Sequence, residues 1–160
     1  MKKIAYMILA LLVFAGCNEP NDPQPPVEEA TLGEKIVGEW HCVISDLEAD
    51  IYLSLGSDQN FELYQKVGDG RHRVYKGIWS ADNASGILSG KYNDGSVWGS
   101  SYKVTLSEDG ASMTLAAEKA SDKEQVYQRC TIPAEVKDNS ITVVKSEQAA
   151  SLLIKRRTSP

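Results

Sequence analysis

Residues 36–55 read IVGEWHCVISDLEADIYLSL, and apolar side chains recur there at every second position. Ile36, Trp40 and Ile44 fall on one face of the first half, together with Gly38 and Cys42. After residues 45–48, Ile51, Leu53 and Leu55 share a face in the same way, whereas Glu39, His41 and Tyr52 lie opposite. A period of two predicts β-strands with one buried and one wet face.

The same alternation continues downstream between regularly spaced turn signals. Asp-Gly pairs at 69–70, 94–95 and 109–110 supply the positive φ angle that tight hairpins require. The segments between turns predict eight strands, at about 37–45, 49–55, 60–67, 73–80, 85–92, 98–106, 111–118 and 123–132. Sequential hairpins without a long crossover favour an all-β, eight-stranded antiparallel up-and-down barrel, whose interior holds side chains or one small ligand. Thr31 and Glu34 match a capping box, which predicts a helical turn before the first strand.

Composition and charge limit the classes of function. The chain has 160 residues, 42% hydrophobic and 24% charged, which is typical of a folded protein with one domain. Its formal net charge is −5, and losing Lys2 and Lys3 with a signal would make the remainder more acidic. We therefore expect no nucleic acid partner.

The N-terminal segment predicts export. Lys2 and Lys3 precede an apolar run, Ile4–Ala15, which is too short to span a bilayer as a helix. The sequence Phe14-Ala15-Gly16-Cys17 resembles the lipobox of bacterial lipoproteins. That resemblance implies cleavage of residues 1–16 and acylation of Cys17, which would anchor the protein to a membrane. The alternative is an ordinary secretory signal followed by a chance cysteine.

Residues 17–30 are rich in proline and acidic side chains, so we expect an extended tether between the anchor and the barrel. Asn18 is not the Asp that retains lipoproteins on the inner membrane in the enterobacterial sorting pattern. By that resemblance the outer membrane of the cell envelope is favoured. The periplasmic face and the surface face of that membrane both stay as alternatives.

The predicted barrel resembles the lipocalins. Gly38-Glu39-Trp40, at the start of the first strand, looks like the Gly-x-Trp entry of that family. The stretch from Phe61 through Gly77-Ile78-Trp79 and Leu88-Ser89-Gly90 to Trp98-Gly99-Ser100-Ser101-Tyr102 is similar to lipocalin-like domains of Gram-negative lipoproteins. The resemblance covers about residues 33–138, within a predicted barrel domain at 31–138.

In typical lipocalins an arginine of the last strand packs across the tryptophan of this motif. Arg129 is the one candidate here, but it alternates against Val126, Cys130 and Ile132. That alternation predicts that Arg129 lies outside the barrel, so either a bulge shifts the register or the contact is absent.

The topology also predicts which end of the barrel holds a ligand. If Gly38 lies at the closed end, the loops near 46–48, 68–72, 93–97 and 119–122 surround the open mouth. Trp40 and Trp79 then have a structural role low in the barrel. The ligand-binding candidates near the mouth are Arg71, His72, Tyr92, Trp98 and Tyr102. The alternative is that these aromatic residues cap the core and the arginine is solvated.

The remaining cysteines, Cys42 and Cys130, lie on the first and last predicted strands, which are neighbours in a closed barrel. The alternation points both side chains inward and so allows a disulfide, with two buried free thiols as the alternative.

The sequence predicts neither an enzyme nor a metal or cofactor site. It has two histidines, His41 and His72, and no HExxH, CxxC or Gly-x-Ser-x-Gly motif. We expect His41 on the surface. Residues 139–160 predict a C-terminal helix through 147–154, with a ninth strand or a loose tail as alternatives.

These observations predict a protein that binds a small apolar or amphipathic ligand through the mouth of the barrel, by burial and without chemistry. The inward apolar residues would be Ile44, Leu53, Phe61, Leu63, Val104 and Leu115. The alternative is a filled barrel whose outer face contacts a protein, as an inhibitor or an envelope-assembly module; the sequence identifies no such partner.

Overall fold

The computed structural model describes residues 29–119 and 124–143. Eight strands follow one another along the chain: β1 (Gly38–Ile44), β2 (Ala49–Leu55), β3 (Asn60–Val67), β4 (Arg73–Asp82), β5 (Ile87–Tyr92), β6 (Tyr102–Leu106), β7 (Ser112–Ala117) and β8 (Gln125–Cys130). A 3-10 turn, η1 (Ser45–Leu47), joins β1 to β2. None of the helices among these residues has the length and apolar character that a bilayer span requires.

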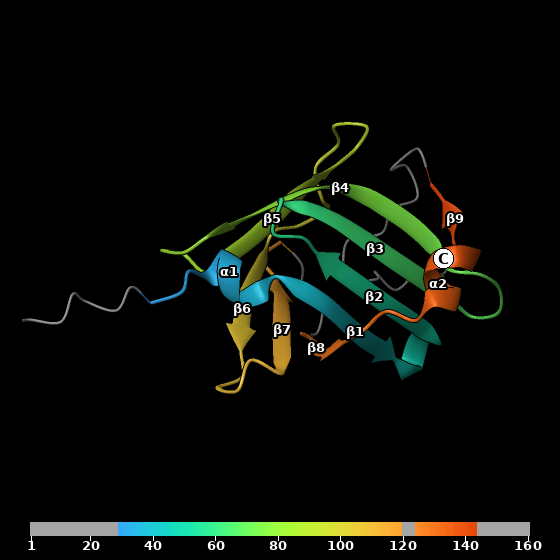
Figure 1. Cartoon of the computed structure of the whole chain (residues 1–160), viewed down its shortest axis with the longest axis horizontal. Helices are drawn as coiled ribbons and strands as arrows, with labels where there is room; N and C mark the ends of the chain where they lie inside the picture. The colour runs from blue at the N-terminus through green and yellow to red at the C-terminus, as the bar shows by residue number, and fades with distance from the viewer. Residues whose placement is uncertain (1–28, 120–123, 144–160) are drawn as a thin grey trace, which may run out of the picture.

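Strands β1 to β8 form a closed antiparallel up-and-down barrel (Figure 1). Each strand pairs with its neighbour in sequence, and β1 pairs with β8 through Glu39 and Cys130, Trp40 and Arg129, and His41 and Gln128. The predicted all-β, lipocalin-like barrel is therefore confirmed. The strands lie where the alternation placed them, except that β6 begins at Tyr102 instead of residue 98.

A short helix, α1 (Leu32–Ile36), lies at one end of the barrel (Figure 1). It has the predicted capping box, in which Thr31 Oγ1 accepts from the Glu34 N–H and the Glu34 carboxylate accepts from the Thr31 N–H. Trp40 Nε1 donates to the Ile36 carbonyl over 2.9 Å, and Trp79 Nε1 donates to the Asn60 carbonyl over 3.1 Å. Both indoles are buried with a hydrogen-bond partner.

Arg129 packs on Trp40, which corrects the face predicted for β8. The guanidinium carbon lies 4.2 Å from the Trp40 ring centroid. Tyr127 is fully buried on the same face of β8, whereas Val126 is 49% exposed. The β7–β8 pairing is continuous from Ser112 to Leu115, so no bulge is needed in that stretch to bring Arg129 inward.

Arg129 was predicted on the wrong face of β8 because the outer face of this sheet also carries apolar residues. The helix α2 (Ala134–Asn139) follows β8 and contributes Val136 to a second cluster, with Tyr64, Val74 and Ile132. Cys130 packs against that cluster. Apolar side chains on β8 therefore pack either under α2 or in the barrel core.

The predicted disulfide is not formed. Cys42 and Cys130 are both free thiols. Cys42 belongs to the barrel core, whereas Cys130 packs on the outer cluster, so the two side chains lie on opposite faces of the sheet. Burial raises the pKa of the Cys42 thiol to about 11.

Side chains from all eight strands of the barrel pack together in its interior. Among the described residues, nineteen buried ones form one cluster, which includes Trp40 and aromatic residues from β3, β4, β5 and the segment before β6. Of the predicted inward residues, Leu53, Phe61, Leu63, Val104 and Leu115 are buried, and Ile44 is partly buried against them.

The chain leaves the barrel beside β4. The strand β9 (Ile141–Thr142) pairs in parallel with Arg73 and Val74, so a ninth strand is present. The helix expected through 147–154 lies outside the described residues, as do the signal, Cys17 and the tether.

Candidate functional site

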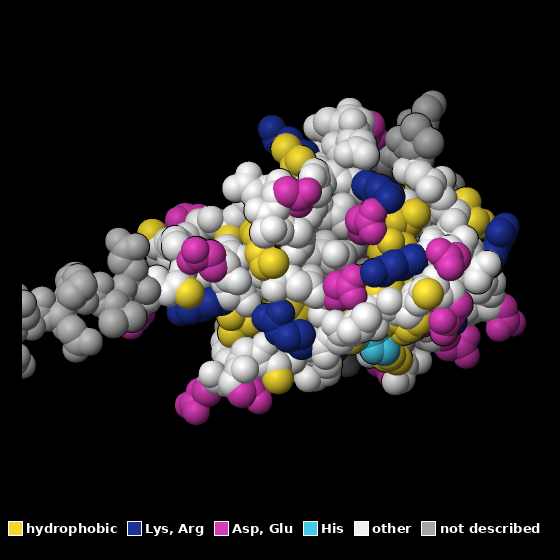
Figure 2. Space-filling view, in the orientation of Figure 1, with side chains coloured by type: hydrophobic (Ala, Val, Ile, Leu, Met, Phe, Trp, Pro, Cys, Tyr) yellow, Lys and Arg dark blue, Asp and Glu magenta, His cyan; other side chains and the backbone are white. Residues whose placement is uncertain are grey.

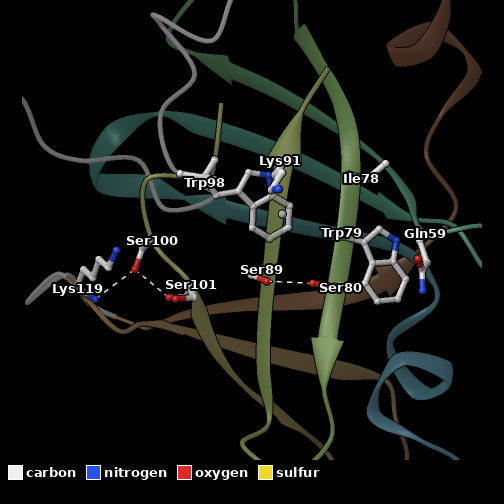
Figure 3. A pocket seen from close by; sticks show the side chains of 12 residues that line it. Gln59, Ile78, Trp79, Ser80, Ser89, Lys91, Trp98, Ser100, Ser101 and Lys119 are labelled. Atoms are coloured by element: carbon white, nitrogen blue, oxygen red, sulfur yellow. Dashed lines mark hydrogen bonds between the residues drawn. The ribbon is translucent and has the colours of Figure 1, made fainter. Parts of the chain in front are cut away.

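A pocket of about 460 Å³ lies in the wall of the barrel formed by β4, β5 and the segment 97–101. Figure 3 shows Trp98, Lys91 and Ser89 in its middle, Lys119 and Ser100 on one side and Trp79 on the other. The pocket is partly open to solvent. It therefore lies along the wall and not in the mouth where the sequence analysis placed the site.

Two buried tryptophans, Trp98 and Trp79, border this pocket. The Trp98 backbone N–H donates to the Gly90 carbonyl over 3.0 Å, which fixes the segment before β6 against β5. The Trp98 ring packs edge-on against Phe61, with centroids 5.0 Å apart, and only 4% of the residue is exposed. The indole nitrogen, Nε1, is buried and has no hydrogen-bond partner.

Gly90 makes this position of Trp98 attainable. A Cβ atom on residue 90 would lie 2.5 Å from two carbons of the Trp98 ring and 2.8 Å from the Ile78 carbonyl oxygen. A side chain of any size would therefore push the indole away from the strand.

Serine side chains supply the fixed polar groups of the pocket (Figure 3). Ser80 Oγ and Ser89 Oγ are 3.1 Å apart across the β4–β5 pair. Ser100 Oγ donates to the Ser101 carbonyl over 2.8 Å and accepts from the Lys119 backbone N–H over 3.2 Å. These bonds hold the hydroxyls in place.

The five residues predicted to bind a ligand do not form one site. Trp98 alone borders the wall pocket. Tyr92 and Tyr102 lie in the core, where Tyr92 packs edge-on against Phe61 with centroids 5.7 Å apart. Burial raises the pKa of Tyr92. The alternative interpretation, in which aromatic residues cap the core, therefore describes these two tyrosines.

Arg71 and His72 line a different pocket, of about 340 Å³, between the β3–β4 loop and α2. Its floor is a network centred on Asp50, whose Oδ1 lies 2.7 Å from His41 Nε2 and whose Oδ2 lies 3.1 Å from His72 Nε2. The His41 ring also stacks on Tyr52 at 4.3 Å. His41 is on the outer face, as predicted.

The two histidines in this network differ in burial. His72 is 9% exposed, and burial lowers its pKa, with Lys66 and His41 adding to the effect and the Asp50 carboxylate opposing it. Each imidazole contacts its own carboxylate oxygen. Within the described ranges, no group of three or more histidine, cysteine or acidic side chains is arranged to hold a metal ion.

The outer face near this network carries mixed charge. Figure 2 shows acidic and basic side chains side by side over the strands, with histidine at the lower edge. Lys76 pairs with Glu62, and Lys137 pairs with Glu39 across 2.7 Å.

Sequence reasoning missed the serines and lysines of the wall pocket. The expected strand 98–106 placed Ser100 and Ser101 in regular alternation, whereas the chain folds back there and β6 begins at Tyr102. A signal was available, because Gly99-Ser100-Ser101 is a poor strand sequence.

We found no protein-family model, curated protein or solved structure that matches this chain.

Proposed function

We propose that this protein is a lipocalin-like lipoprotein that binds a small amphipathic ligand in the pocket beside Trp98. The anchor in this proposal is an acylated Cys17, which the sequence Phe14-Ala15-Gly16-Cys17 supports, and the site of action is the outer membrane. In this proposal no residue has a catalytic role.

The observation that carries the proposal is the indole nitrogen of Trp98. A buried N–H without an acceptor costs about 1–3 kcal/mol relative to one that is hydrogen-bonded. Trp98 Nε1 has no acceptor, whereas Trp40 and Trp79 each have one. Trp98 Nε1 is closed to solvent in this structure, so a ligand oxygen would supply the missing bond once the side chains around the indole move.

The surroundings of Trp98 suit a ligand with an apolar part. Trp79, Ile78 and Val97 border the same pocket, and the last two are 55% and 66% exposed. Covering such surface contributes about 25 cal/mol per Å² removed from water. The volume of about 460 Å³ falls within the usual range of small-molecule sites.

Native and denaturing mass spectrometry test the proposal. The chain is exported, purified with Cys17→Ser to avoid the lipid anchor, and compared with a variant that also carries Trp98→Phe, which removes the N–H and keeps an aromatic ring. We expect additional mass that is lost on denaturation and is reduced in the Trp98→Phe variant. A bare protein mass after exposure to envelope lipid extracts would contradict the proposal.

The anchor has its own test. We expect radiolabelled palmitate to be incorporated into the wild-type chain, which then fractionates with outer membranes, and not into the Cys17→Ser variant. Equal labelling of the two would contradict the assignment of Cys17.

A second candidate function rests on a different surface. Val43 on β1 and Val126 on β8 are 59% and 49% exposed, on strands that pair with each other. Together with the packed core, they favour a barrel that contacts a protein through its outer face. Capture of an envelope protein by the wild-type chain and not by a Val126→Glu variant would favour this candidate.

A further inference from the structure

One buried side chain holds the β3–β4 loop, residues 68–72, on the barrel. His72 has 9% of its surface exposed, whereas residues 69–71 are exposed. The loop contains two glycines with positive φ, Gly68 at 64° and Gly70 at 124°, and a Cβ at Gly70 would meet nothing within 4 Å. Because glycine adopts many backbone conformations and open space surrounds Gly70, the loop has room to move once His72 is released.

The His72 imidazole contacts a carboxylate that two other basic groups also contact. Asp50 Oδ2 lies 3.1 Å from His72 Nε2 and 3.7 Å from Lys66 Nζ, and Asp50 Oδ1 lies 2.7 Å from His41 Nε2. Three basic side chains, from β1, β3 and the loop, therefore surround one acidic side chain of β2. Further titratable or charged groups that face this cluster are Tyr52 of β2, whose ring centroid lies 5.7 Å from that of His72, and Arg71 of the loop and Glu135 of α2, which line the same pocket.

Mild acid adds positive charge to this cluster. An imidazole ordinarily gains its proton near pH 6.5, above the range in which carboxyl groups lose their charge. With both histidines protonated, three positive charges would stand beside the single negative charge of Asp50. Burial lowers the pKa of His72, with Lys66 and His41 adding to the effect and Asp50 opposing it. Protonation of His72 therefore favours a conformation in which its ring reaches water.

His72 also holds the last described strand through its backbone. The Ile141 N–H donates to the His72 carbonyl over 2.9 Å, and the Val143 N–H donates to the Val74 carbonyl over 3.0 Å. These bonds attach β9 in parallel to the start of β4. Since β9 has two residues, withdrawal of the His72 carbonyl removes a large part of its attachment.

We propose that Asp50, His41 and His72 form a pH-sensitive switch that holds the β3–β4 loop closed near neutral pH and releases it in acid. In the open form His72 leaves Asp50 for solvent, and β9 separates from β4. The pocket of about 340 Å³ between the loop and α2 then loses the part of its wall that Arg71 and His72 form. The open loop binds the proton more readily than the closed loop, so opening is favoured as the pH decreases through about 6.5. This switch is independent of a ligand at Trp98.

Amide hydrogen exchange, measured by NMR on the exported Cys17→Ser chain, tests the switch. Each exchange rate is divided by that of an unstructured peptide at the same pH, which removes the intrinsic effect of acid on exchange. We expect the protection of the Ile141 amide to fall several-fold between about pH 7.5 and 5.5. The amides of Leu53 in β2 and Leu115 in β7 lie within the barrel and should lose less protection. An equal loss at all three positions would indicate opening of the whole barrel and overturn the proposal.

Two variants connect the opening to the cluster. His72→Gln keeps a polar side chain that does not titrate, so the protection of Ile141 should no longer depend on pH in this window. Lys66→Gln removes one positive charge near Asp50 and should lower the pH at which Ile141 loses protection. The control is Lys35→Gln, which removes an exposed lysine of α1 and should leave that pH unchanged. Circular dichroism checks that each variant is folded.

Each outcome supports or overturns the switch. If His72→Gln keeps the full pH dependence, the proposal is overturned. If His72→Gln does not fold, Lys66→Gln and Lys35→Gln still test it, and equal midpoints in these two variants overturn it. Spectra of the imidazole nitrogens report protonation directly, and His72 should gain its proton over the same pH range in which Ile141 loses protection. A His72 ring that stays neutral while β9 separates would overturn the proposal as well.

Discussion

Arg129 illustrates how single residues hold the first and last strands together. Its side chain lies over Trp40 and donates to the carbonyls of Val37, Lys35 and Gly110 over 2.9, 2.9 and 3.0 Å. Gly38 permits this arrangement, because its φ angle is +141° and a Cβ atom there would meet the Arg129 guanidinium. The Gly-x-Trp motif therefore supplies both the space and the ring that the arginine needs.

Replacing Arg129 by methionine should destabilise the barrel. The change removes a cation–π contact and three charge-assisted hydrogen bonds, which are partly solvated, so we expect the free energy of unfolding to fall by about 1–3 kcal/mol. Urea unfolding measures the effect. Arg71→Met is the control, because Arg71 is exposed and forms no described ion pair. Equal losses in the two variants would contradict the structural role of Arg129.

His72 should make stability depend on pH. Burial lowers its pKa below the ordinary value of 6.5 in the folded state. The unfolded chain then binds the proton more readily, so the free energy of unfolding falls as the pH decreases through 6.5. We expect His72→Gln to reduce this loss between about pH 7.5 and 5.5, a window above the titration of ordinary carboxyls. Parallel curves for the wild type and the variant in urea unfolding would refute the assignment.

At the scale of elements, the pattern of apolar residues predicted the strands well and their faces less well. The Asp-Gly turns and the period of two located all eight strands, because hairpin chemistry and one-sided burial are local properties of the sequence. The face predicted for β8 was wrong, because Ile132 is buried and Cys130 partly buried in the cluster under α2, outside the barrel core. Which of two apolar surfaces buries a strand residue depends on tertiary packing.

The two cysteines test this correction directly. Burial raises the pKa of the Cys42 thiol to about 11, whereas Cys130 is only partly buried. In the Cys17→Ser chain we expect iodoacetamide near neutral pH to alkylate Cys130 well before Cys42, with Cys42 alkylated after unfolding. Peptide mass spectrometry measures both sites. A pair that resists alkylation in denaturant until a reductant is added would show a disulfide and contradict the structure.

The contact between β5 and the segment before β6 is sensitive to one added carbon atom. Gly90→Ala would place Cβ against the Trp98 ring and the Ile78 carbonyl, so we expect a loss of about 1–3 kcal/mol in the free energy of unfolding. Tryptophan fluorescence should change as the indole moves. Gly33→Ala in α1 is the matched control, because its Cβ would meet ordinary contacts of 3.9 Å and alanine favours helix. A fluorescence spectrum unchanged by Gly90→Ala would mean that the glycine does not position Trp98.

At the scale of the whole molecule, the sequence predicted the barrel but not which residues gather around its pockets. The ligand site was predicted at the mouth because the topology places alternate loops at that end of the barrel. That prediction did not include the packing of Tyr92 edge-on against Phe61 and Tyr75 in the core. Trp98 borders the wall pocket, but the other residues that line it come from segments distant in sequence, such as Ser80 and Lys119. Such groupings depend on side-chain packing in three dimensions, which the alternation of residues along one strand does not determine.

The most direct test of a ligand at Trp98 is the indole N–H resonance of each tryptophan in a ¹H–¹⁵N spectrum recorded during titration with octanoate. Three indoles are present, at Trp40, Trp79 and Trp98, and variants to phenylalanine assign them. The account predicts that the Trp98 resonance shifts as its free N–H gains an acceptor, while the Trp40 and Trp79 resonances, already bonded to carbonyl oxygens, stay in place. A titration in which binding occurs and Trp98 does not move would contradict it.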